Sequence, residues 1–347
     1  MVRMIALCGA VTFAATAVAH HSPNVHFDRN DVVEIEGVLT EVEWRNPHIQ
    51  LTITTRDENG SKVVWQVEES NRNVQLRRGV TEDDYQVGEV IRVAGFRGLR
   101  NRTAIFATNT LLVSGRELLG STASGPRWTS DLVMTKGDYQ ASKLARPAIG
   151  SNSLFRVWSV AAETHLPGTS RAGSPLWKDS YPLTQEAQVV LETWDPVADN
   201  PYLNCEHGLP AIMDAIAPME FVLEDPDILL RLEEQDVVRR IYMGSAPTRA
   251  VPSPYGYSNG RWEGETLVVT TTEIGWPWFD QSGVPQSEAL RLIERFSVSE
   301  DGQHLDYSVE ATDPAVFTET VLMEKRWIWI PGEEVKPYDC SYERHDL

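Results

Sequence analysis

The sequence has little cysteine, few basic residues and no long hydrophobic run beyond its amino-terminal end. Only 3 cysteines occur among 347 residues. Beyond residue 20 no run is long and apolar enough to cross a membrane. Lys and Arg total 31 against 50 Asp and Glu, a net charge of −19. Such a surface repels nucleic-acid phosphates and anionic lipids, so we expect no nucleic-acid partner and no stable membrane insertion.

Familiar catalytic motifs are missing as well. The sequence contains no G-x-S-x-G nucleophile elbow, no P-loop, no G-x-G-x-x-G after a strand and no Cys–His zinc spacing. Nucleotide chemistry and Ser-based acyl transfer therefore have no visible machinery. The sequence does not name a reaction, but it does indicate a compartment, an architecture and several candidate sites.

The first 19 residues predict an export signal. Arg3 supplies a positive charge, residues 5–15 are apolar, and Ala17-Val18-Ala19 has the small-x-small pattern of a cleavage site. Cleavage after Ala19 would make His20 the first residue of a mature chain, 20–347, located in the periplasm or secreted.

Two cysteines remain after the signal is removed. Cys8 leaves with the signal, while Cys205 and Cys340 stay in the mature chain. In an oxidising compartment an even pair is most simply a disulfide, and we predict this bond. Two separate buried thiols are the alternative.

Residues 20–116 predict a first domain of strands. A change of apolar phase after Gly37 predicts a bulge in a long strand over 32–44. Alternating strands over 49–53 and 63–67 flank a turn, residues 70–78 predict a helix, and further strands follow at 90–95 and 103–113. This order is that of a small, OB-like, five-stranded barrel.

The rest of the chain predicts a linker over 117–150 and a second domain over 151–347. Thr184 should cap a short helix within 183–194, and Asn259-Gly260 should form a turn. Seven short strands follow in quick succession from residue 219, over 219–223, 228–233, 237–243, 266–273, 290–298, 304–312 and 320–330. The fold class is mainly β, with the second domain an antiparallel barrel or curled meander that is lipocalin-like.

Several motifs are similar to those of exported bacterial proteins of unknown function. Ala19-His20-His21-Ser22, the segment from Gly37 to His48 and Leu76-Arg77-Arg78-Gly79 resemble one such family, whose members carry a mature A-H-H-S start and a W-x-N-P-H segment. The segments at 260–269 and 287–296 resemble a different uncharacterised exported module with G-x-W-E-G-[DE]-T-L-V-V. These resemblances imply export and domain boundaries, and no activity.

Four histidines lie in the first domain, at His20, His21, His26 and His48. A free amino group on His20 would add a nitrogen ligand beside its imidazole, and copper(II) favours such nitrogen-rich, tetragonal sites. These residues are therefore candidate copper ligands. The alternative is that the terminal pair is loose and that His48 only supports a turn behind Pro47.

Candidate ligand-binding residues lie in the second domain. Trp262, Trp276 and Trp278 could contact a small organic molecule at a barrel mouth, or could simply fill the barrel end. Arg239 and Glu294 share their strand faces with large apolar residues, so both should point inward and meet each other or a bound polar ligand. His207, close to Cys205, could complete such a site.

Two classes of function follow. The first is an exported small-molecule-binding or accessory protein that binds copper through its mature N-terminal histidines. The second is an exported enzyme acting on a small organic molecule in the second barrel, with carboxylate and histidine groups as general acid and base.

Overall fold

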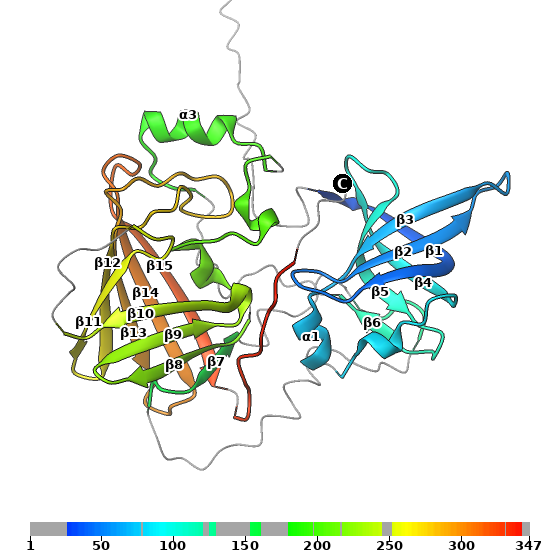
Figure 1. Ribbon diagram of the computed structural model, residues 1–347. Helices are drawn as coiled ribbons and strands as arrows, with labels where there is room; N and C mark the ends of the chain where they lie inside the picture. The colour runs from blue at the N-terminus through cyan, green and yellow to red at the C-terminus, as the bar shows by residue number, and fades with distance from the viewer. Residues whose placement is uncertain are drawn as a thin grey trace, which may run out of the picture.

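A computed structural model describes residues 26–77, 79–120, 125–129, 153–160, 180–196, 198–215, 217–244, 252–329 and 331–341. It contains an N-terminal sheet and a C-terminal closed barrel, with the last described segment running between them (Figure 1). None of the helices in these ranges has the length and hydropathy that crossing a bilayer requires.

The N-terminal sheet has the order β3-β2-β1-β4-β5-β6. Its strands are β1 (Phe27–Glu43), β2 (Gln50–Arg56), β3 (Lys62–Glu68), β4 (Val90–Gly98), β5 (Ala104–Leu111) and β6 (Glu117–Leu119). Because β3 also pairs with β5 in parallel, the first five strands close on themselves as β1-β2-β3-β5-β4. This is the OB-like barrel that the sequence predicts.

Short helices complete the N-terminal unit. The helix α1 (Arg72–Arg77) lies between β3 and β4 in the chain, within the predicted range, and the 3₁₀ turn η2 (Glu82–Asp84) follows it. A core of aliphatic side chains, among them Leu39, Ile53 and Val93, fills the barrel without exposure to solvent.

The predicted bulge in β1 is present but lies beyond Gly37. The pairing of β1 with β2 shifts register between Leu39 and Glu41, whereas Ile35, Gly37 and Leu39 all stay buried in one phase. Gly37 serves a different purpose, because a Cβ atom there would lie 2.6 Å from the carbonyl oxygen of Thr54. The glycine permits the close approach of β2, and the bulge follows it.

The predicted linker is wrong at its start. Glu117 to Leu119 form β6 against the end of β5, and all three residues are buried. The Glu117 carboxylate then accepts hydrogen bonds from the backbone amides of Arg127, Trp128 and Thr129 at 2.7–3.1 Å. Three residues are too few for a periodic signal, so the sequence pattern missed this strand.

The C-terminal barrel closes in the order β10-β11-β12-β13-β14-β15-β7-β8-β9. Its strands are β7 (Val157–Val160), β8 (Met219–Glu224), β9 (Asp227–Leu232), β10 (Val237–Tyr242), β11 (Tyr257–Glu263), β12 (Thr266–Thr272), β13 (Arg291–Val298), β14 (His304–Thr312) and β15 (Val321–Trp329). The barrel is antiparallel except where β10 meets β11, which run in parallel. Asn259 and Gly260 lie inside β11 and form no turn; the turn comes later, at Gly264, where φ is +64°.

Helices and loops cover one end of this barrel. Thr184 accepts a hydrogen bond from the Ala187 amide and caps α3 (Gln185–Thr193), as predicted. The remaining 3₁₀ turns are η4 (Pro201–Asn204), η5 (Ala211–Asp214) and η6 (Glu234–Asp236). Figure 1 shows α3 above the barrel and the N-terminal sheet beside it.

Candidate functional site

The centre of the C-terminal barrel holds a buried ion pair between Arg239 and Glu294. Their side chains are 2% and 0% exposed, and both point inward as the strand alternation predicts. Arg239 donates through Nη1 to Glu294 Oε1 at 2.8 Å, and its Nη2 contacts the second carboxylate oxygen. The sequence alternative in which these residues meet each other is therefore the one observed.

Three neutral hydroxyls complete this cluster. Ser258 accepts from Arg239 Nε at 2.9 Å, Thr271 accepts from Nη2 at 2.6 Å, and Tyr307 donates to Glu294 Oε1 at 3.0 Å. Each of the consecutive strands β10 to β14 thus supplies one residue, because each presents every second side chain to the interior.

The electrostatics favour the charged pair. Burial opposes the charge on Arg239, but the Glu294 carboxylate outweighs it and the pKa of Arg239 is raised. Burial also raises the pKa of Tyr307 well above its usual value, so this hydroxyl stays a donor. The arrangement holds two opposite charges in a satisfied network, and its hydrogen-bonding capacity is directed at its own members.

His207, Trp276 and Trp278 lie in loops at one end of the barrel. His207 is 8% exposed, stacks on Tyr255 and contacts the Tyr255 hydroxyl through Nδ1 at 2.8 Å. Burial lowers the pKa of His207 to about 4, so the imidazole is neutral at pH 7. Trp276 packs over Gly208, where a Cβ would lie 2.4 Å from the ring, and Trp278 packs edge-on against Trp194.

Trp262 lies at the other end of the barrel. It pairs with Leu267 close to the turn at Gly264 and contacts Phe155, with 44% of its surface exposed. The structure therefore separates the predicted ligand-binding residues into three places, which are the barrel interior, the loop-covered end and the opposite end.

A plug that sequence reasoning missed closes the loop-covered end. Residues 209–215 include η5, whose four residues are all buried; Ala211, Ile212 and Met213 belong to the hydrophobic core of the barrel. Lys325, on β15, donates to the carbonyl oxygens of Met213 at 3.2 Å and Ala215 at 3.0 Å. A lysine on an inward position is the sequence signal for such a backbone contact, because a buried ammonium needs acceptors.

The predicted copper ligands fall partly within the described residues. His20 and His21 lie outside them. His26 directly precedes β1, and His48 follows the Trp44–Pro47 corner. Phe106 packs near both positions. Its ring centroid lies 6.1 Å from that of His48 and 5.6 Å from that of Phe27, the residue that follows His26.

Glu68 is close to both histidines. Its carboxylate lies 3.5 Å from His48 Nδ1, and its charge partly offsets the effect of burial, which lowers the pKa of His26. No group of three His, Cys, Asp or Glu side chains in the described part of the chain is close enough to hold a metal ion by itself.

The tautomer of His48 is fixed by its backbone contact. Its Nδ1 lies 2.8 Å from the Glu69 carbonyl oxygen, and a carbonyl oxygen can only accept. In the neutral imidazole Nδ1 therefore carries the proton and donates it, which leaves the lone pair on Nε2. This is the orientation in which a histidine ligates a metal while its other nitrogen is held by the protein.

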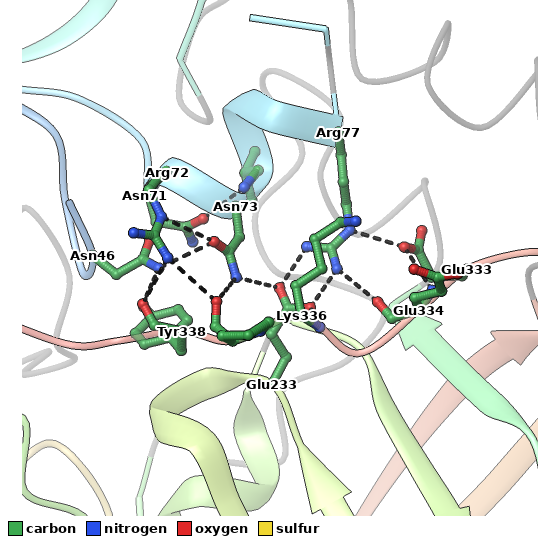
Figure 2. Close-up of polar contacts among 12 residues, drawn as sticks. Asn46, Asn71, Arg72, Asn73, Arg77, Glu233, Glu333, Glu334, Lys336 and Tyr338 are labelled. Atoms are coloured by element: carbon green, nitrogen blue, oxygen red, sulfur yellow. Dashed lines mark hydrogen bonds and ion pairs between the residues drawn. The ribbon is translucent and has the colours of Figure 1, made fainter. Parts of the chain in front are cut away.

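A dense polar cluster joins the two units and was not assigned from the sequence. Residues 331–341, which we call the C-terminal strap, pass between the N-terminal sheet and the barrel (Figure 2). At its centre Arg77, from α1, forks onto both carboxylate oxygens of Glu233 and contacts Glu333 at 3.0 Å. All three side chains are at most 6% exposed.

Two asparagines extend this cluster. Asn73 donates to Glu233 at 3.1 Å and to the Pro337 carbonyl at 3.1 Å, while Asn46 donates to the Tyr338 carbonyl at 2.5 Å. Asn46 and Arg77 belong to the W-x-N-P-H and L-R-R-G segments. The only sequence signal for this cluster was that the two motifs contain polar residues with no evident partner nearby. The partners of Asn46 and Arg77 lie about 150 to 290 residues away in the chain, so they leave no local pattern.

Cys205 and Cys340 lie at disulfide-bonding distance, with a Cα separation of 6.0 Å. The bond joins the strap to the loop that also carries His207. The pairing agrees with the sequence prediction.

No curated protein matches the chain. Residues 9–105 match the model of a family described as "Family of unknown function (DUF6152)". The match extends from before the described residues to the start of β5, so it covers most of the strands of the N-terminal OB-like barrel and none of the C-terminal barrel.

Proposed function

We propose that this chain is an exported accessory protein whose N-terminal part binds copper(II) through His20 and His21, with His26 and His48 as further candidate ligands. The observation that carries the proposal is the 2.8 Å contact between His48 Nδ1 and the Glu69 carbonyl oxygen. The His48 Nδ1 proton is held by the Glu69 carbonyl oxygen, which leaves Nε2 as the ligating nitrogen.

The donor set fits copper(II). After cleavage behind Ala19, the amino group and imidazole of His20 would form a chelate, and His48 Nε2 would add a further nitrogen. Copper(II) prefers nitrogen ligands in a tetragonal arrangement. Bound copper would supply redox or Lewis-acid chemistry, while Glu69 would keep the His48 ring oriented.

The N-terminal residues can reach His48. His26 lies six positions after His20, and an extended chain of this length spans up to about 20 Å. Phe27 and His48 both pack on Phe106, at centroid distances of 5.6 Å and 6.1 Å. The terminal histidines and His48 are therefore within reach of one ion.

We assign the C-terminal barrel the role of a rigid partner for the metal-binding unit. An enzyme working in the barrel interior would use Arg239 and Glu294, but these charges already neutralise each other and bond to three hydroxyls. No contact of these two residues favours the enzymatic alternative, so we do not adopt it.

The test is copper(II) titration of two purified proteins, one beginning at His20 and one beginning at Ala19. The extra residue removes the terminal amine from the His20 chelate and should weaken binding by about tenfold or more. Equal affinity of the two proteins would refute the terminal chelate.

A second pair of variants tests the role of His48. His48→Gln should also weaken binding by about tenfold or more, because it removes one nitrogen donor. His304→Gln is the matched control, since His304 is a half-exposed histidine on the barrel. Copper affinity that is equal in the His48 variant and the control would remove His48 from the site.

A further inference from the structure

The C-terminal strap is an extended segment held almost entirely by side chains. Among its described residues only Cys340 takes part in strand pairing, as a parallel bridge to Asn46. Buried backbone groups outside a sheet need other partners. The two flanking units provide them from opposite sides.

The N-terminal unit binds the carbonyl oxygens of the strap. Arg77 donates to the Glu334 carbonyl at 3.0 Å, Asn73 to Pro337 at 3.1 Å and Asn46 to Tyr338 at 2.5 Å. These donors come from α1 and from the corner after β1, and they bind carbonyl oxygens of the strap from residue 334 to residue 338.

The barrel binds the amides of the same segment. The Glu233 carboxylate accepts from the Lys336 amide at 2.8 Å, and Asp236 accepts from the amides of Tyr338 and Asp339 at 2.8 and 2.9 Å. The strap is therefore fixed in position between the two units.

Left-handed backbone conformations concentrate at this junction. Cys205, Gln235, Asp236 and Asp339 have φ values of 49–65°, although none is glycine. Non-glycine residues keep such conformations only where the surroundings enforce them, and they gather at functional sites. Here the strap contacts and the Cys205–Cys340 bond provide the enforcement.

The end of the strap docks on the corner that carries His48. The Ser341 amide donates to the Asn46 carbonyl at 3.0 Å, and Arg45 Nη1 donates to the Ser341 carbonyl at 3.0 Å. Only Pro47 separates Asn46 from His48. The disulfide at Cys340 lies between the Tyr338 contact and the Ser341 contact, so it anchors the part of the strap that touches this corner.

We infer that the disulfide-anchored strap positions His48 by bonding to the Asn46 backbone and the Arg45 side chain, and so tunes copper binding at His48. The inference rests on the proposed function for its metal and on the described contacts for its geometry. Cys340 and Ser341 act here as positioning residues and do not touch the metal.

The test uses the full processed chain carrying Cys205→Ser and Cys340→Ser together. A first readout needs no metal. It is hydrogen exchange at the Ser341 amide and at the amide of Ile49, which follows His48 and donates to the Ser70 carbonyl oxygen at 3.4 Å, together with the long-range ¹H–¹⁵N correlation of the His48 ring. We expect faster exchange at both amides and a loss of the pure Nδ1-protonated form. The second readout is copper(II) affinity, which should fall by about tenfold.

A single-residue variant keeps the test independent of the disulfide. Arg45→Met removes one donor to the Ser341 carbonyl and leaves both cysteines in place. Arg56→Met is its matched control, because Arg56 also donates to a backbone carbonyl, that of Gly60 at 2.8 Å, but at the far hairpin. Arg45→Met should loosen the corner and weaken copper binding, and Arg56→Met should do neither.

The outcomes separate the two proposals. Unchanged exchange and an unchanged His48 tautomer in both the cysteine and Arg45 variants would overturn the positioning role. A looser corner with unaltered copper affinity would overturn the tuning role. A parent protein that binds no copper would refute the proposed function and the tuning with it, while the metal-free readouts would still decide whether the strap positions His48.

Discussion

Removing either charge of the buried Arg239–Glu294 pair should destabilise the barrel strongly. Removing both charges together should cost less than the sum of the two single losses. Glu294→Gln leaves the Arg239 guanidinium, 2% exposed, without a counter-charge, and Arg239→Met leaves a carboxylate that is 0% exposed. Breaking a buried pair from one side costs about 3–5 kcal/mol of the free energy of unfolding. Each single variant should lose this amount.

The double variant should lose less than the sum of the single losses. It carries no uncompensated charge, and the Ser258–Thr271 hydroxyl contact at 3.1 Å can persist. The remaining loss comes from the hydroxyls of Ser258, Thr271 and Tyr307, whose bonds to the two charged side chains are removed or weakened. Each hydroxyl left without a partner should cost about 1–3 kcal/mol of the free energy of unfolding. We therefore expect a coupling energy of at least about 2 kcal/mol between the two positions.

The assay is urea unfolding of the four proteins, followed by tryptophan fluorescence and far-UV circular dichroism. Arg295→Met is the matched control, because Arg295 neighbours Glu294 in β13 but is 39% exposed and pairs with Glu263 at 3.4 Å. An exposed pair contributes about 0–1 kcal/mol. Single variants that unfold like this control, or a double variant that loses the full sum, would refute a buried and coupled pair.

Three further predictions concern other parts of the chain. His207 has a pKa of about 4 in the folded protein against 6.5 in the unfolded chain, so the unfolded state takes up the proton first and stability falls as the pH drops from about 6.5 towards 4. Between pH 7 and pH 5 the free energy of unfolding, measured in urea, should fall by about 2 kcal/mol. His207→Gln should remove this pH-dependent loss, so identical pH profiles for the parent and the variant would contradict the prediction. Gly37→Ala should destabilise by about 1–3 kcal/mol in thermal unfolding, because its Cβ would meet the Thr54 carbonyl, whereas Gly244→Ala, with open space around it, should have little effect. An N-terminal fragment ending at residue 129 should melt more cooperatively than one ending at 116, which loses the buried Leu118 and Leu119 and about 3–6 kcal/mol of apolar burial; equal melting curves would show that β6 adds nothing.

The strand pattern predicted most of the architecture because burial and strand period coincide. Arg239 and Glu294 sit among alternating apolar residues, and that alternation alone places them inside the barrel. The same logic gave the order of the OB-like barrel. It failed at β6 and β7, which have three and four residues, because so short a segment shows no period.

The contacts between the units could not be predicted from the sequence. Glu233 lies next to a 3₁₀ turn and Arg77 ends a six-residue helix, so neither is marked by periodicity. Their partnership depends on two separately folded surfaces meeting across a third segment. Similarly, Asn259-Gly260 has the composition of a turn, but tertiary pairing with Val269 and Thr270 keeps it in a strand.

The strap also bears on the order in which parts of the chain can fold during synthesis. Its Tyr338 carbonyl contacts Asn46 across 292 positions of the chain, among the most distant contacts in the protein. The N-terminal barrel leaves the ribosome first, and domains generally fold as units. Its Arg77 and Asn73 therefore lack their partners in the strap, the Glu333 side chain and the Pro337 carbonyl oxygen, until the end of the chain has been synthesised. A chain interrupted before the strap would keep that polar surface open to solvent and proteases. The contacts between the two units that the strap makes can therefore form only after the last barrel strand, β15, has been synthesised.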